Sequence, residues 1–300
     1  MHLDNKKILA GVVLSSAIIL SDGTFSEPVL AAQTSVNVRV NIEQESYADW
    51  TSGVEPEVVA VGIAPKDPRS MALAREAAIM SAQRTLLGTI KEIRIDSDTV
   101  MRDFMIEHDL VNRKINGIIR GAQVVEERPL EDGGYYVKMR VLIFGRNSSI
   151  ASAIIPEIVP ENPTPFESVT QPSINRSEVR EVQSAGYTGV IVDASGLGVE
   201  PTFSPVIYDT SGRAIYGIAN LNEESIVERG MVSYSTSTSD EIALQRAGSN
   251  PLIVRAAEMR GGDNSANSVN AVISVEDADR ILLANEKTHM LENCAVVFVK

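Results

Sequence analysis

The sequence predicts an α+β fold in which two α/β sandwich domains are joined by a Pro-rich linker and preceded by a cleaved signal peptide. Three observations support this prediction. An apolar run follows two lysines near the N-terminus, prolines gather between residues 146 and 186, and strand-like and helix-like segments alternate on both sides of them. The expected divisions are a signal peptide (1–32), a first domain (33–145), the linker (146–186) and a second domain (187–300).

The N-terminus has the pattern of an export signal. Lys6 and Lys7 precede the apolar run Ile8–Leu20, which is shorter than the roughly 20 apolar residues that a membrane span requires. We expect cleavage near Ala32, where small residues suit a signal peptidase, and no integral membrane span in the mature chain. The protein is then expected outside the cytoplasm, secreted into the periplasm or associated with the cell surface. The alternative is that the same run remains as an uncleaved anchor.

The charge balance bears on possible partners. The chain has 27 Lys and Arg against 40 Asp and Glu, a formal net charge of −13, and no basic stripe interleaved with aromatics. A phosphate backbone is bound by clustered basic side chains, so we expect no nucleic-acid partner. Cys294 is the single cysteine, which rules out an intramolecular disulfide, and it lies far from the cleavage point where a lipid anchor would be attached. Its apolar neighbours predict an inert, buried thiol.

The first domain is predicted to contain a small sheet. Alternation and apolar runs predict strands, and the glycines of residues 131–134 predict the turn of a hairpin. The expected strands are 36–42, 58–64, a short one at 93–95, 121–129 and 135–144.

Two helices are expected on one face of that sheet. Residues 69–91 are dominated by helix formers, and small residues at spacings of three and four predict a surface that approaches its neighbour closely. This small-residue stripe consists of Ala74, Ala77, Ala78, Ser81, Thr85 and Gly88. The apolar face of the second helix consists of Phe104, His108, Val111, Ile115 and Ile118. Because no second histidine is near His108 in sequence, we expect a core or boundary histidine and not a metal ligand.

The expected linker is distinguished by composition. Five of the chain's 13 prolines lie between Arg146 and Gly186, amid Ser, Asn and Glu without sustained periodicity. These features predict a semi-rigid, partly extended segment. The short apolar run Ile154–Ile155 and Ile158–Val159 within it can still attach to one domain.

The second domain is predicted to be a mixed α/β layer. The expected strands are 188–194, 203–209, 213–218, 251–259, 268–274 and 293–300, and the expected helices are 223–229, 240–247 and a longer one ending near 290. Ser274 followed by Asp277 predicts the start of the longer helix, because this pair resembles a capping box.

The glycine-rich turn after the strand 188–194 is the best candidate for a ligand contact. Asp193, Ser195, Gly196 and Gly198 place a carboxylate, a hydroxyl and flexible backbone at a strand end. A phosphate site would require a helix to follow, but the next residues lead into another strand. We therefore expect a structural turn, with a weak site for a small polar ligand as the alternative.

No catalytic or metal-binding pattern is recognisable, and we expect no cofactor and no enzyme. The acidic cluster between Asp96 and Asp109 lacks the central glycine and closing glutamate of a calcium loop. Beyond residue 32 only His108 and His289 remain, in different predicted domains, so a nucleophile–histidine pair is disfavoured. Carboxylates that meet in space remain a further alternative, which would make the protein a hydrolase.

The first domain resembles a known family. Its residues 74–78 (AREAA), 82–87 (AQRTLL), Arg102–Asp103 and 118–127 (IIRGAQVVEE), followed by a hairpin, are similar to the lipoprotein-20 family of bacterial envelope proteins, which includes the FlgP-like flagellar components. The resemblance covers about residues 56–145 and implies no catalytic residues. It implies assembly in the cell envelope, often as oligomers, although this chain lacks the lipobox cysteine of lipid-modified relatives.

These observations lead to two expectations for function. The first is a non-enzymatic exported envelope protein that mediates protein–protein assembly, with a flagellar or cell-surface association implied by the resemblance. Its partners would be envelope proteins, including further copies of itself. The alternative is a soluble extracytoplasmic module that binds a small polar ligand or a cell-wall glycan near Asp193 and Ser195.

Overall fold

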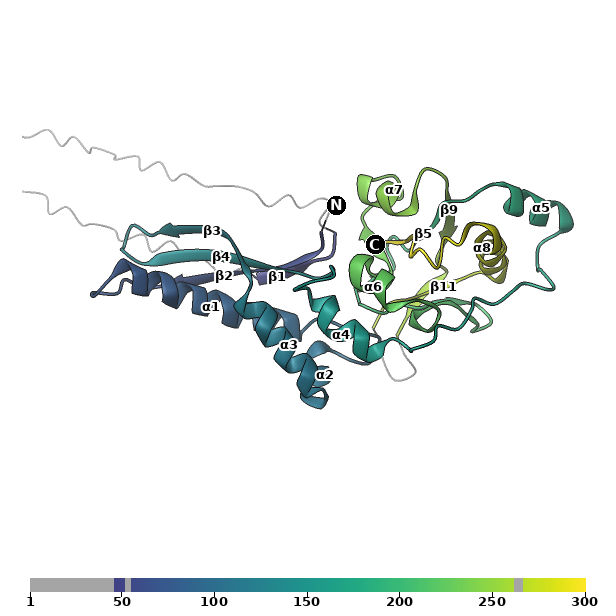
Figure 1. Cartoon of the computed structure of the whole chain (residues 1–300). Coiled ribbons are helices and arrows are strands. Elements are labelled where there is room, and N and C mark those ends of the chain that lie inside the picture. The colour runs from purple at the N-terminus through teal and green to yellow at the C-terminus, as the bar shows by residue number, and fades with distance from the viewer. Residues whose placement is uncertain (1–45, 52–54, 262–266) are drawn as a thin grey trace, which may run out of the picture. The chain divides into compact units, whose positions relative to one another are not determined.

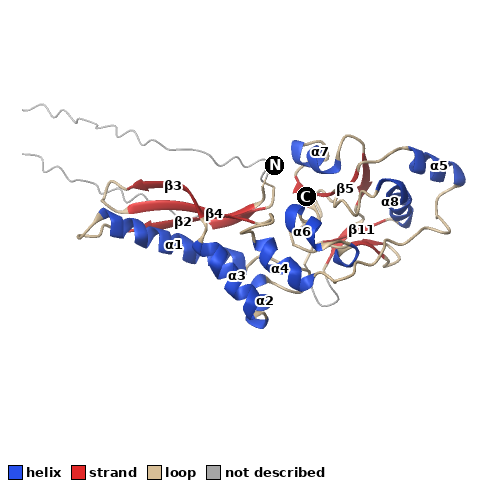
Figure 2. Cartoon of the chain, viewed as in Figure 1, coloured by secondary structure: helices blue, strands red, loops and turns tan. Residues whose placement is uncertain are grey.

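The N-terminal part of the computed structural model is an antiparallel sheet with a long helix on one face (Figures 1 and 2). The structure describes residues 46–51, 55–261 and 267–300, so the predicted signal peptide and the predicted strand 36–42 lie outside the described residues. The strands of this N-terminal sheet run in the order β1 (Ser46–Asp49), β2 (Glu57–Ala64), β4 (Tyr135–Leu142) and β3 (Gln123–Pro129). The predicted hairpin is confirmed as β3 and β4.

Helix α1 (Met71–Lys91) packs on this sheet through side chains spaced four residues apart. The side chain of Ser70 caps its N-terminus by accepting a hydrogen bond from the N–H of Ala72 at 3.0 Å. The buried positions are Ala74, Ala78, Ala82, Leu86 and Ile90. The predicted stripe was therefore partly wrong, because Ala77 and Gly88 are exposed.

The close approach predicted for α1 is confirmed at Gly62 of β2. A Cβ atom on Gly62 would lie 2.0 Å from the backbone oxygen of Ala78 and 2.3 Å from the backbone nitrogen of Ala82. Only a residue without a side chain fits at this crossing, which explains how the small residues of α1 seat it against the sheet.

The second predicted helix is two helices. Helices α2 (Met101–Glu107) and α3 (Asp109–Arg120) meet at His108, whose backbone leaves the helical region with φ −120° and ψ 89°. The imidazole stacks on the ring of Phe104 with a centroid distance of 4.0 Å. It is half-buried, as expected of a boundary histidine. The predicted strand 93–95 is reduced to bridges from Arg94 to Val100 and Thr202.

Residues 146–186, for which the sequence predicted a semi-rigid, partly extended linker, contain two helices. Helix α4 (Ile150–Ile158) buries Ile150, Ile154 and Ile155 and contacts α3 and α6, while α5 (Arg176–Ser184) contacts α8. The apolar residues of α4 account for this packing. The prolines that follow Pro156 lie beyond the end of α4, so the stretch before them is long enough for two helical turns. The segment is thus packed against both parts of the chain and does not hang between them.

In the C-terminal part, the described residues form two four-stranded sheets. The parallel sheet has the order β8 (Ser233–Ser235), β12 (Val296–Val299), β5 (Gly189–Asp193) and β9 (Pro251–Arg255). The mixed sheet has the order β10 (Glu258–Arg260), β11 (Asn270–Ile273), β6 (Ile207–Asp209) and β7 (Ala214–Tyr216). The described residues of this part also form the α-helices α6 (Glu223–Arg229), α7 (Glu241–Ala247) and α8 (Val275–Thr288) and a 3₁₀ turn at Ile218–Asn220.

The predicted mixed α/β character of this part is confirmed, with differences in the strands. The predicted strand 251–259 is divided between β9 and β10, which belong to different sheets. Strand β8 was not predicted, and residues 203–206 precede β6 without joining it. Ser274 caps α8 by accepting a hydrogen bond from the N–H of Asp277 at 3.0 Å, as the sequence predicted.

A buried ionic network holds α8 and the segment around Ser173 against the mixed sheet. Arg213 donates from Nε to Asp209 and from Nη2 to Asp279, each at 2.8 Å. The second oxygen of Asp279 accepts hydrogen bonds from the N–H and the hydroxyl of Ser173 at 2.8 and 2.7 Å. Burial disfavours the charged form of Asp279, but the bonds from Arg213 and Ser173 outweigh burial and lower its pKa.

Aromatic side chains join the N-terminal sheet to the C-terminal part. The ring of Trp50 meets those of Phe203, Tyr234 and Phe144 edge to face, with centroids 5.2, 5.9 and 6.0 Å away. These contacts lie within a single compact unit, residues 43–300. None of the helices in the described ranges is long and apolar enough to cross a membrane.

Candidate functional site

The predicted ligand turn lies at the carboxyl end of β5. Asp193 Oδ1 accepts hydrogen bonds from the N–H of Ser195 at 3.0 Å and from its hydroxyl at 2.6 Å. The hydroxyl of Ser195, the N–H of Ser195 and the nearby guanidinium of Arg255 together lower the pKa of Asp193. Gly196 and Gly198 have φ values of +81° and +71°, which side-chain-bearing residues rarely adopt.

The structure therefore brings the four predicted residues together as a local turn. The hydroxyl of Ser195 is directed at Asp193, so the two groups that would contact a ligand bind one another. The second oxygen of Asp193 lies 3.8 Å from Arg255 Nη1, whose side chain is largely exposed. This geometry accounts for the turn without a ligand.

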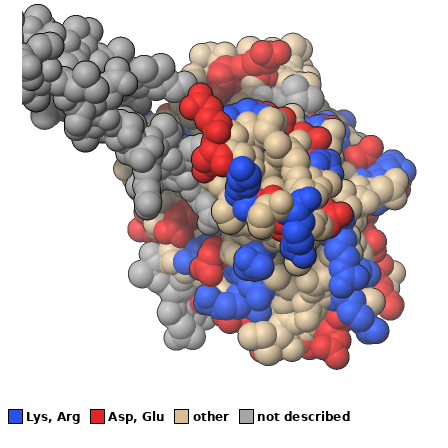
Figure 3. Space-filling view, turned by 90° about the vertical axis from the view of Figure 1, so that its left-hand side faces the viewer, with Lys and Arg blue, Asp and Glu red and all other residues tan. Residues whose placement is uncertain are grey.

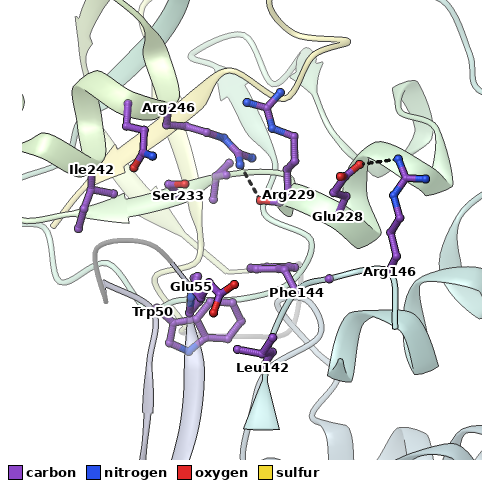
Figure 4. Close-up of a pocket in the computed structure, with 14 residues that line it drawn as sticks. Trp50, Glu55, Leu142, Phe144, Arg146, Glu228, Arg229, Ser233, Ile242 and Arg246 are labelled. Carbon is purple, nitrogen blue, oxygen red and sulfur yellow. Dashed lines mark hydrogen bonds and ion pairs between the residues drawn. The ribbon is translucent and has the colours of Figure 1, made fainter. Parts of the chain in front are cut away.

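A pocket of about 440 Å³ lies elsewhere, and we call it the aromatic pocket. Segments from distant parts of the sequence line it: the residue after β1, the end of β4, the end of α6, β8 and α7 (Figure 4). Its volume falls in the range of small-ligand and side-chain binding sites.

One wall of the aromatic pocket is apolar. Trp50 and Phe144 form it together with Leu142. The indole is 8% exposed, because Phe203 and Tyr234 lie behind it. The phenol of Tyr234 is fixed in turn, since it accepts from the N–H of Thr202 at 3.0 Å and donates to its carbonyl at 3.1 Å. The wall is therefore backed by a rigid core and is already formed before any ligand arrives.

Arg246 of α7 lies on the opposite side of the pocket (Figure 4). Its guanidinium donates to the carbonyl oxygens of Cys294 and Arg229, both at 2.6 Å, and to that of Gly230. Burial lowers its pKa, and no carboxylate of the described residues forms an ion pair with it. Two of these carbonyls, those of Arg229 and Gly230, lie at the C-terminal end of α6. They stabilise the positive charge, because a helix dipole is negative at that end.

Two polar side chains next to Arg246 have no hydrogen bond within the described chain. The hydroxyl of Ser233 and the amide of Gln245 both line the pocket, and neither bonds to another residue among those the structure describes. They are available as donors and acceptors to a bound molecule.

The rim of the pocket carries both charges. Arg146 pairs with Glu224 and Glu228 of α6, at 2.8 and 2.9 Å. Two carboxylates line the pocket, those of Glu228 and Glu55. Glu55 forms no ion pair with any residue in the described ranges. On the molecular face drawn in Figure 3, basic and acidic side chains are likewise interspersed and form no single basic stripe. The rim thus offers Glu55 as a point where a basic group would bind.

The pocket shows no arrangement for nucleophilic or metal chemistry. No histidine lines it, so the hydroxyl of Ser233 has no imidazole base beside it. Across the part of the chain that the structure describes, no three His, Cys, Asp or Glu side chains are grouped in a way that would hold a metal ion.

Sequence reasoning did not find the aromatic pocket. Trp50 is the only tryptophan in a chain with 5% aromatic residues, and this rarity is the one sequence signal that could have indicated the pocket. Gln245 and Arg246 lie in an ordinary amphipathic helix, where nothing local marks them.

Residues 189–300 match the family described as Treponema pallidum Tp0624, second domain. No curated protein matched the chain. The match begins at the first residue of β5, which agrees with a second domain that starts near this position. It includes Ser233, Gln245 and Arg246 but not Trp50 or Phe144, so the pocket combines matched and unmatched parts of the chain. The lipoprotein-20 resemblance of the first domain stays a prediction.

Proposed function

We propose that the chain is a non-enzymatic, exported protein of the cell envelope that assembles with a partner protein by holding a short segment of it in the aromatic pocket. The observation that carries this proposal is the lining itself. An apolar wall of Trp50 and Phe144 faces the unengaged side chains of Ser233 and Gln245. Tryptophan and arginine are enriched where binding energy concentrates in protein interfaces, and apolar walls with a few polar groups anchor single side chains.

The chemistry of the lining defines the segment. An apolar side chain would pack on Trp50 and Phe144, and its flanking backbone would bond to Gln245 and Ser233. Glu55 favours a basic residue next to that anchor. The net charge of −13 favours the same partner, because opposite charge speeds encounter. The export signal that the sequence predicts supports binding outside the cytoplasm.

The alternative function, binding of a small polar ligand or glycan at Asp193 and Ser195, is less well supported. These side chains satisfy one another within the turn, whereas the pocket groups do not. A ligand at the turn would have to replace a 2.6 Å hydrogen bond that already lowers the pKa of Asp193.

The test is site-specific crosslinking in cells. A photoreactive residue replaces Gln245, which lines the pocket and is exposed, and the control carries it at Glu286, exposed on α8 outside the pocket. We expect a discrete adduct with an envelope protein from position 245 only. The purified partner should then change the fluorescence of Trp50, the only indole of the chain. Equal adducts from both positions, or no adduct from position 245, would contradict the proposal.

A further inference from the structure

Among the residues that the structure describes, strand β9 is an edge of the parallel sheet. Its neighbour there is β5, and beyond Arg255 the chain crosses to the mixed sheet as β10. The long edge strand of the N-terminal sheet, β3, is different, because it carries a register shift between Val124 and Glu126, three consecutive charged residues (126–128) and Pro129. Such features discourage edge-to-edge pairing. In β9 the proline and the charge lie at the two ends, Pro251 and Arg255, while the residues between them are apolar and pair with β5 without a register shift.

The register shows which backbone groups of β9 point outward. Ile253 pairs with Ile191 and Arg255 with Asp193, and the N–H of Ala256 donates to the carbonyl of Asp193 at 2.9 Å. In a parallel ladder this bond requires alternate residues of β9 to face β5. The N–H and C=O groups of Ile253 and Arg255 therefore point away from the sheet, where a further strand would lie.

An apolar surface accompanies these groups. Ile253 is 53% exposed and lies on the same sheet face as Ile191, the face that α7 covers through Ala243 and Ala247. Ile242 and Gln245 of α7 line the aromatic pocket beside β8, on the other side of the sheet from β9. A strand added to β9 would cover Ile253.

The sequence of β9 is complementary to itself. If a second copy lies antiparallel with Ile253 opposite its own equivalent, the two isoleucines exchange both backbone hydrogen bonds. Each Arg255 then donates its N–H to the carbonyl of Pro251 in the other copy, which makes four hydrogen bonds in all. Pro251 has no N–H, but it lies at the end of the strand, where only the carbonyl of Arg255 is left without a partner. Each arginine faces a proline, so no like charges are opposed.

We propose that two copies of this chain pair through β9 in this antiparallel register, about a two-fold axis, and so join their parallel sheets into one. The contact is isologous, because the same strand serves both copies. It does not use the aromatic pocket, whose lining lies on the β8 side of the sheet, and it can succeed or fail independently of the proposed function. The paired strands are short, so we expect a dimer that dissociates on dilution.

Sedimentation of the purified exported protein over a range of concentrations tests the proposal. We expect a reversible monomer–dimer equilibrium, with the dimer lost in Ile253→Lys. The matched control is Val125→Lys, at a side chain 44% exposed on the other long edge strand, β3, and this variant should dimerise like the unchanged protein. A chain that stays monomeric at all concentrations, or a dimer that persists in folded Ile253→Lys, would overturn the proposal.

Disulfide crosslinking tests the proposal independently of whether Ile253→Lys folds. Directly opposed residues of a hydrogen-bonded antiparallel pair have Cα atoms about 5.5 Å apart, a distance that a disulfide spans. Under mild oxidation Ile253→Cys should therefore form a covalent dimer, whereas Val125→Cys should not. The native Cys294 is buried and gives no background. Absence of the crosslink in folded Ile253→Cys would also contradict the proposed register.

Discussion

Replacement of Arg213 by methionine tests whether the buried ionic network stabilises the fold. The side chain donates two charge-assisted hydrogen bonds at 2.8 Å, to Asp209 and Asp279. Each is worth about 1.5–3 kcal/mol, and Arg213 is 27% exposed, which reduces their sum. Removing one partner of a buried ion pair costs about 3–5 kcal/mol, because the other charge stays buried. We therefore expect Arg213→Met to lower the free energy of unfolding by about 3–5 kcal/mol at pH 7.

The pH dependence follows from the two carboxylates. Burial opposes their ionisation, but hydrogen bonds from Ser211 and Arg213 at Asp209, and from Arg213 and Ser173 at Asp279, lower both pKa values in the folded protein. A lowered pKa contributes stability above the unfolded value, about 3.9 for Asp, and the contribution is lost as the pH falls through the folded value. In Arg213→Met the two carboxylates have lost the arginine, so protonation at low pH removes buried charges that have no cationic partner and stabilises this variant relative to the unchanged protein. The difference between the two proteins should thus be largest near neutrality and should shrink below about pH 4.

Urea unfolding followed by Trp50 fluorescence measures these differences. The indole is buried where the two parts of the chain meet, so its emission reports loss of the whole fold. The control is Arg102→Met, at a half-exposed arginine paired with Glu92, where we expect a change of about 0.5 kcal/mol or less. A loss below about 1 kcal/mol for Arg213→Met, or a loss that is the same at pH 3 and pH 7, would refute the account of the network.

Substitutions at Gly62, Gly88 and Ser70 and a labelling experiment on Cys294 have clear expected outcomes. Gly62→Ala should cost at least about 3 kcal/mol in urea unfolding, since its Cβ meets the backbone of α1, whereas Gly88→Ala, with nothing within 4 Å, should stabilise the same helix by about 0.5–1 kcal/mol. Ser70→Ala should lower the unfolding free energy by about 1 kcal/mol because α1 loses its cap, and Ser70→Asp should restore it. The thiol of Cys294, whose pKa is raised by burial, should react with a thiol reagent only as fast as the protein unfolds. Rapid labelling of the folded protein would contradict its burial.

Local patterns in the sequence were sufficient for much of the fold. The helix-former run of α1, the glycine turn of the β3–β4 hairpin and the serine cap of α8 each determine a nearby conformation through nearby residues. Failures occurred where no local signal exists. No proline or glycine marks the break at His108 or the change of sheet after Arg255, because long-range packing sets both.

The candidate site was less accessible to sequence reasoning than the fold. The turn at Asp193 and Ser195 was recognisable because its members are adjacent in sequence. The aromatic pocket joins Trp50 to Gln245, almost two hundred positions apart in the chain, and no spacing rule connects them. Patterns of burial predict that such residues pack, but only the fold determines what they pack against.

The edge-to-face contacts of Trp50 with Phe203 and Tyr234 cross the boundary of the region of sequence similarity. The matched region starts at residue 189, and Trp50 and Phe144, which lie outside it, cover one side of the almost completely buried Phe203 and Tyr234. A fragment cut at that boundary would present these rings to water, and we expect it to aggregate. Evolution can exchange the segment that precedes this region only for one that brings aromatic side chains to the same place.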